Sequence, residues 1–156
     1  MHVKTDTVDL LVETLASGLD HPGAVEPLDN DTILITERSG QLRILRDGIL
    51  STPVKGIPPL YTDVQGGLFD VAVSPDFVND HTLFFTATQP FNDGIGVVVF
   101  HSKLAGDGAW LAETRTIFHS SAPNIVDHNF GACIAIAPDG PLFVTIGDQA
   151  REALAT

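Results

Sequence analysis

A threefold repeat is the feature of this sequence that most restricts the folds open to it. Each copy holds a short apolar strand, a turn rich in Pro, Asp and Gly, and a second apolar strand that ends in Thr. The first strands begin at Ala24, Val71 and Ile134, so the copies start 47 and 63 residues apart. Pro and Asp favour tight turns, and β-branched and aromatic residues favour strands, so each copy predicts a β-hairpin. The closing threonines are Thr36, Thr86 and Thr145.

Further strands are expected after the hairpins, at residues 42–46, 97–101 and 114–118. Four short strands that recur at about 45–60 residues are typical of the blades of a β-propeller. The expected fold is therefore all-β, a partial β-propeller of about two to three blades. Residues 1–156 are expected to form one such domain, truncated within the third blade. A small β-sandwich fits the length as well, but it does not account for the repeat.

Charge and hydropathy argue against two classes of partner. The formal net charge is −12, with 20 acidic against 8 basic residues, and such a surface repels the phosphate backbone of nucleic acids. No stretch approaches the roughly 20 apolar residues of a membrane span. Residues 1–7 lack the basic and apolar segments of a signal peptide, so the expectation is a soluble protein whose location stays open.

Three groups of motifs, in this order and spacing, resemble the glucose/sorbosone dehydrogenase family. Members of that family are soluble aldose sugar dehydrogenases that depend on pyrroloquinoline quinone (PQQ). The motifs are LASGLDHP and LITERSGQLR at 15–22 and 34–43, QGGLFDVA and SPDF at 65–72 and 74–77, and DHNFG, IAPDG and TIGDQ at 127–131, 136–140 and 145–149. The resemblance runs from about Leu10 to the end of the chain.

The resemblance implies a six-bladed propeller of the quinoprotein dehydrogenase type. PQQ would lie in a groove at its top with calcium bound to the quinone, where the metal acts as a Lewis acid. A histidine would take the proton of the anomeric hydroxyl of an aldose while hydride passes to the quinone, which yields a lactone.

The resemblance also implies which residues form the site. Gln65 matches a glutamine that contacts the sugar or the quinone, and the Gly-Gly pair after it would allow a ligand close to the backbone. His128 is the candidate catalytic base. A gap-free count back from residues 137–140 instead puts the family's histidine on Asn129, which cannot act as a base and would contact the cofactor. Asp148 matches an aspartate that holds the histidine, and Asp127 is a second candidate for that role.

Two residues depart from the family pattern. Cys133 stands where close relatives carry an arginine that reaches the quinone, and its apolar neighbours predict a buried core residue. Glu26 lies mid-strand where the family has an apolar residue, so its carboxylate must face solvent or a partner. No residue is assigned to a metal, because the other histidines lack metal-ligand spacing. Binding of PQQ and calcium by this chain alone is therefore doubtful, and it is expected to be incomplete or inactive on its own.

Two other functions remain open at this point. The chain could be a non-catalytic, propeller-derived module that binds a protein or glycan, or a homo-oligomer that completes its ring with copies of itself. A calcium-dependent lactonase would need carboxylate and Asn ligands around one metal. The Asp and Asn residues here occupy turns with no visible convergence, which disfavours the lactonase.

Overall fold

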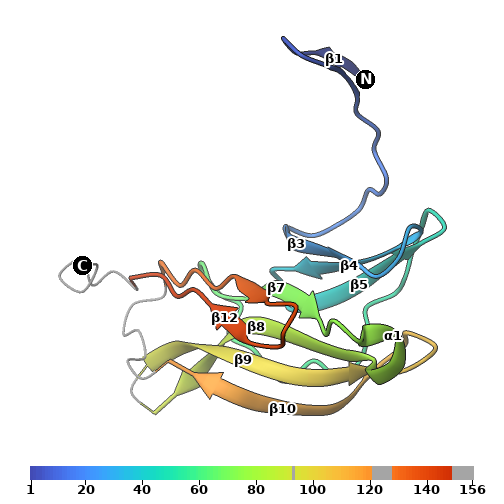
Figure 1. The fold of residues 1–156 in the computed structure, drawn as a ribbon. Coiled ribbons are helices and arrows are strands. Elements are labelled where there is room, and N and C mark those ends of the chain that lie inside the picture. Colours follow the sequence, from blue (N-terminus) through green and yellow to red (C-terminus); the bar gives the residue numbers. More distant parts are fainter. Residues whose placement is uncertain (93, 121–127, 149–156) are drawn as a thin grey trace.

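The computed structural model describes residues 1–92, 94–120 and 128–148 of the chain. Its regular structure is almost entirely antiparallel sheet. A small hairpin of β1 (His2–Lys4) and β2 (Asp9–Leu11) stands away from the body at the end of an extended segment (Figure 1). Among the described residues, no helix has the length and apolar character needed to cross a lipid bilayer.

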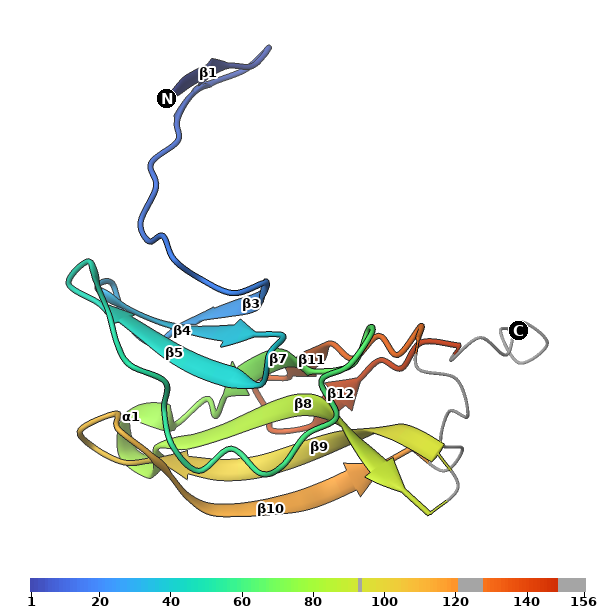
Figure 2. The same cartoon turned by 180° about the vertical axis from the view of Figure 1, so that it is seen from behind.

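The repeats form blades in which each strand pairs with the next strand in sequence. Figure 2 shows the first blade lying across the second, with the third hairpin beside them. The first blade contains β3 (Pro22–Pro27), β4 (Thr32–Glu37), β5 (Gln41–Arg46) and β6 (Ile49–Leu50). The second contains β7 (Leu68–Val73), α1 (Phe77–Asp80), β8 (Thr82–Phe91), β9 (Gly94–Leu104) and β10 (Leu111–His119). The third hairpin is β11 (Ile134–Ile136) and β12 (Leu142–Val144).

This arrangement confirms the prediction of an all-β, partial propeller. The strands expected at 42–46, 97–101 and 114–118 lie within β5, β9 and β10. Two four-stranded blades and a two-stranded hairpin account for the repeat.

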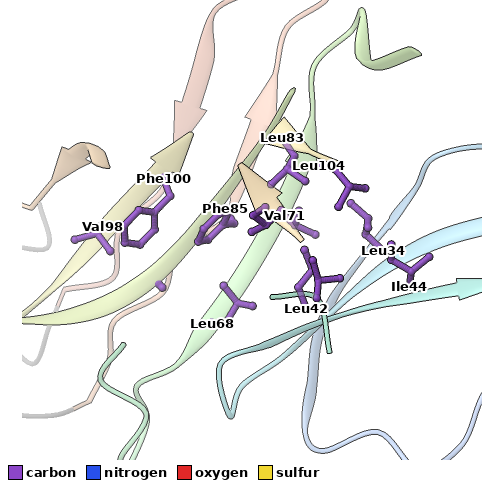
Figure 3. Packing of buried hydrophobic residues seen from close by; sticks show 13 residues of the cluster. Leu34, Leu42, Ile44, Leu68, Val71, Leu83, Phe85, Val98, Phe100 and Leu104 are labelled. Carbon is purple, nitrogen blue, oxygen red and sulfur yellow. The ribbon is translucent and has the colours of Figure 1, made fainter. Parts of the chain in front are cut away.

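The main apolar core lies between the first two blades (Figure 3). Leu34 and Leu42 of the first blade are 0% and 1% exposed, and they share one buried cluster with Val71 and Phe85 of the second. Phe85 also stacks on Phe100 with 4.9 Å between ring centroids. Each fully buried side chain of this size stabilises the fold by about 1.5–3 kcal/mol, so this cluster holds the two blades together.

A threonine hydroxyl joins the first blade to the second. The innermost strand β3 has a bulge between Pro22 and Val25, which leaves backbone groups outside the ladder with β4. The Thr36 hydroxyl accepts the N–H of Ala24 at 2.9 Å and donates to the carbonyl of Phe69 in β7 at 2.6 Å. Thr36 is fully buried, so its hydroxyl satisfies one backbone group in each blade.

The same arrangement joins the second blade to the third hairpin. The innermost strand β7 has its bulge between Leu68 and Val71. The Thr86 hydroxyl accepts the N–H of Asp70 at 3.1 Å and donates to the carbonyl of Ala132 at 2.6 Å. Thr86 is also fully buried. In the first two blades, the threonine that closes the hairpin therefore couples its own blade to the following one.

Two carboxylates add further bonds between blades. Glu26 accepts the N–H of Val73 at 3.2 Å, and Asp70 accepts the N–H of Ile134 at 2.8 Å. Glu26 thus faces a partner, as its mid-strand position required. Burial between the blades raises the pKa of Glu26 above its usual value, and the neighbouring Asp70 charge acts in the same direction, against the hydrogen bond from Val73.

Candidate functional site

The innermost strands of the blades run in the same direction. Gly23, near the start of β3, lies against the carbonyl of Phe69, and Glu26, further along β3, binds the N–H of Val73. β11 likewise packs beside β7. The segments that precede these strands therefore meet at one edge of the molecule, and this edge carries the motif residues.

Gln65 and Asn129 are joined directly at this edge. The side-chain Oε1 of Gln65 accepts the backbone N–H of Asn129 at 2.9 Å, across 64 residues of sequence. Asn129 has a φ of 57°, a left-handed conformation that asparagine adopts more readily than most residues. Both residues are exposed. Besides this bond, the Gln65 amide carries two N–H donors and a second lone pair on Oε1.

The Gly-Gly pair after Gln65 serves the packing of the protein itself. A Cβ on Gly67, which has a φ of 144°, would collide with the backbone carbonyl of Arg38. A Cβ on Gly66 would lie 2.7 Å from the Tyr61 carbonyl and 2.9 Å from the Thr88 hydroxyl. Both glycines are buried. The expectation that they leave room for a ligand was wrong, because neighbouring protein groups fill that space.

A second contact brings the Asp148 segment to the same edge. The carbonyl of Phe130 accepts the N–H of Gly147 at 2.6 Å, and Phe130 is only 2% exposed. Gly147 packs closely under the carbonyl of Asn129, leaving no room for a side chain. His128 and Asp148 are half-buried; His128 immediately precedes Asn129, and Asp148 immediately follows Gly147. The structure therefore gathers Gln65, His128, Asn129 and Asp148 on adjoining loops, while Asp127 lies outside the described residues.

A buried ion pair anchors the neighbouring loop of the first blade. Glu37 is 1% exposed, accepts the N–H of Asp20 at 2.7 Å and lies 3.5 Å from the Arg43 guanidinium. Next to it, the Asp20 carboxylate lies 2.6 Å from His21, and this hydrogen bond lowers the pKa of Asp20. These contacts fix the segment that leads into β3.

The chemistry available at this edge is polar and protic. An imidazole can act as a general base near neutral pH, a carboxylate can orient it, and amide donors suit the oxygens of a quinone or a sugar. Among residues 1–92, 94–120 and 128–148, no group of three or more His, Cys, Asp or Glu side chains could hold a metal.

Cys133 differs from the prediction. It is exposed, whereas its apolar neighbours indicated a buried residue. The alternation of a strand gives the reason, since the preceding Ala132 is 4% exposed and successive side chains point to opposite faces. The backbone of Cys133 is held by the Thr145 hydroxyl, which accepts its N–H at 3.2 Å.

The inter-blade residues Thr36, Asp70 and Thr86 were not recognised from the sequence as structural residues. The signal was present, since a threonine closes the second strand of every repeat. Its role depends on the carbonyl of the following blade, which sequence spacing does not reveal.

Comparison with known proteins places this fold among sugar dehydrogenases. The structure matches a solved glucose dehydrogenase with a TM-score of 0.87 at 30% identity, over 92% of this chain and 46% of that one. It also matches the fold of the PQQ-bound aldose sugar dehydrogenase of Streptomyces coelicolor, with a TM-score of 0.73 at 23% identity, over 90% of this chain and 42% of that one. The chain thus has the propeller fold of these dehydrogenases over part of their length.

The sequence comparisons identify the family. The model of the glucose/sorbosone dehydrogenase family matches residues 19–156, so the chain belongs to that family. The chain is 34% identical over 141 residues to the aldose sugar dehydrogenase YliI of Escherichia coli, which covers 88% of this chain and 38% of that protein. The chain therefore spans less than half the length of these relatives.

Proposed function

We propose that the edge formed by Gln65, His128, Asn129 and Asp148 is part of a centre that oxidises aldoses to lactones with PQQ. The observation that carries the proposal is the hydrogen bond from Asn129 to Gln65. It brings together two family motifs from different blades at the edge where the inner strands begin. Membership of the family and the names of the relatives support the reaction class.

Each of the four residues has a separate role in this reaction. His128 accepts the proton of the anomeric hydroxyl on a ring nitrogen, and Asp148 orients the imidazole. The amide donors of Gln65 and the side chain of Asn129 bind oxygens of the quinone or the sugar. PQQ, when bound, supplies the acceptor for the hydride that leaves the anomeric carbon. The oxygen that has lost its proton then forms the carbonyl of the lactone.

Titration of the purified chain with PQQ, followed by quinone absorbance, tests the proposal. We expect saturable binding that Gln65→Ala weakens, because that variant removes the amide donors and frees the Asn129 backbone. Asn30→Ala is the matched control, since Asn30 is an exposed amide in the turn between β3 and β4, at the far end of β3. Absence of saturable binding, or equal weakening by both variants, would overturn the assignment of this edge.

A second measurement separates binding from chemistry. With PQQ and calcium present, we expect little dye-linked aldose oxidation, because the described residues hold no metal cluster and the chain spans less than half of its relatives. Any turnover should disappear in His128→Ala while PQQ binding persists. If Asn129→Ala abolishes turnover and His128→Ala does not, His128 is not the base.

A further inference from the structure

The third repeat contains a threonine in the same position as the two that join the blades. The Thr145 hydroxyl accepts the N–H of Cys133 at 3.2 Å, as Thr36 accepts that of Ala24 and Thr86 that of Asp70. Thr36 and Thr86 are fully buried, but Thr145 is exposed. No described residue accepts the proton of its hydroxyl.

The missing acceptor can be identified from the two complete pairs. In each blade, one backbone N–H binds the threonine of that same blade. The carbonyl that accepts from the threonine of the preceding blade belongs to the residue immediately before that N–H. Phe69 precedes Asp70, and Ala132 precedes Cys133. In the first blade the corresponding residue is Gly23, which precedes Ala24. Gly23 is exposed and lies in the bulge of β3.

Apolar side chains near Thr145 and near Gly23 are exposed, although equivalent side chains in another blade are buried. Val25 is 63% exposed, while Val71, its equivalent in the second blade, is 2% exposed. Phe143, two residues before Thr145, is 61% exposed, while Leu34, its equivalent two residues before Thr36, is fully buried. The first blade and the third hairpin therefore each expose an apolar face of the kind that a neighbouring blade covers elsewhere in the fold.

We propose that two copies of the 156-residue chain close on each other, with the Thr145 face of each receiving β3 of the other. The Thr145 hydroxyl of one copy would donate to the Gly23 carbonyl of its partner. The pairing is reciprocal, as a twofold dimer requires. This inference does not depend on PQQ binding.

Sedimentation velocity over a range of concentrations, with a reductant present, tests the dimer. We expect Thr145→Val to raise the dissociation constant about 30-fold, because each dimer loses two neutral hydrogen bonds. Thr116→Val makes the same change at an exposed site on the outer strand β10 and should leave the constant unchanged. Labelling of the Cys133 thiol should slow as the dimer forms. A monomer at all concentrations, or a dimer indifferent to Thr145→Val, would overturn the proposal.

The head-to-tail pairing has its own test. Phe143→Asp and Val25→Asp each spoil one of the two faces, and either alone should abolish the dimer. Phe118→Asp, at a phenylalanine 44% exposed on β10, is the control and should dimerise normally. Mixing the Phe143→Asp and Val25→Asp chains restores one intact contact, so a heterodimer should reappear. If the mixture stays monomeric while the control dimerises, the two faces do not pair with each other.

Discussion

Replacing Thr86 with valine removes one hydroxyl and keeps the shape of the side chain. Two backbone groups lose their partner, the N–H of Asp70 in the second blade and the carbonyl of Ala132 at the third hairpin. Thr86 is fully buried and Ala132 is 4% exposed, so water cannot readily replace the lost hydroxyl. The change therefore tests whether the threonine couples the blades energetically.

The expected loss of unfolding free energy is about 1–5 kcal/mol. A buried polar group left without a partner costs about 1–3 kcal/mol, and two such groups are created. The additional buried methyl group of valine offsets about 0.8 kcal/mol. With an m value of about 2 kcal/mol per M, typical of small proteins, the urea midpoint should fall by about 0.5–2.5 M.

Urea unfolding followed by circular dichroism measures this loss. Thr86→Ser keeps a hydroxyl and should retain most of the stability, while Thr116→Val makes the same chemical change at an exposed position and should shift the midpoint little. If Thr86→Val unfolds at the same midpoint as the unmodified chain, with an unchanged m value, the hydroxyl bridge is energetically unimportant.

Two further predictions follow from packing and burial. Gly67→Ala should destabilise the fold by about 3 kcal/mol or more, because its Cβ collides with the Arg38 carbonyl at a φ of 144°, whereas Gly106→Ala meets no atom within 4 Å and should be neutral in urea unfolding. Glu26→Gln should be more stable than the unmodified chain at neutral pH. The pKa of Glu26 is raised in the folded state, so protonated Glu26 contributes its full stability below the ordinary pKa of 4.5. That contribution is lost as the pH rises through the pKa of Glu26 in the folded state. The amide oxygen still accepts the Val73 N–H, so urea midpoints should converge below pH 4.5, and a gap that widens on acidification would contradict this cause.

Local patterns in the sequence predicted the hairpins because hairpin pairing is local. The turn residues near Asp76 and Asp139 and the apolar runs beside them specify two neighbouring strands without reference to the rest of the chain. The contacts between blades were less accessible. Thr36 and Asp70 act on backbone groups 33 and 64 residues away, and nothing in their immediate neighbours marks those partners.

At the candidate site, too, local motifs were predicted correctly and contacts between blades were not. The motif spacing predicted which segments carry Gln65 and Asp148, and the fold places both segments at one edge. The reason for the Gly66–Gly67 pair was misread, because the Arg38 carbonyl that excludes a side chain belongs to another blade. For Cys133, the apolar composition of the segment outweighed the strand alternation that leaves it exposed.

The serial packing of the blades has a consequence for how the molecule opens. The second blade contacts the first blade through β3 and β4, and it contacts the third hairpin through β11. For each of these neighbours, the second blade provides the main contact among the described residues. In arrays of this kind, opening begins at the ends and the free energy of opening rises toward the middle. Among the strands of the blades, amide hydrogen exchange should therefore be slowest in β8 and β9 and fastest in β3 and β12. The terminal blades would then exchange before the whole chain unfolds.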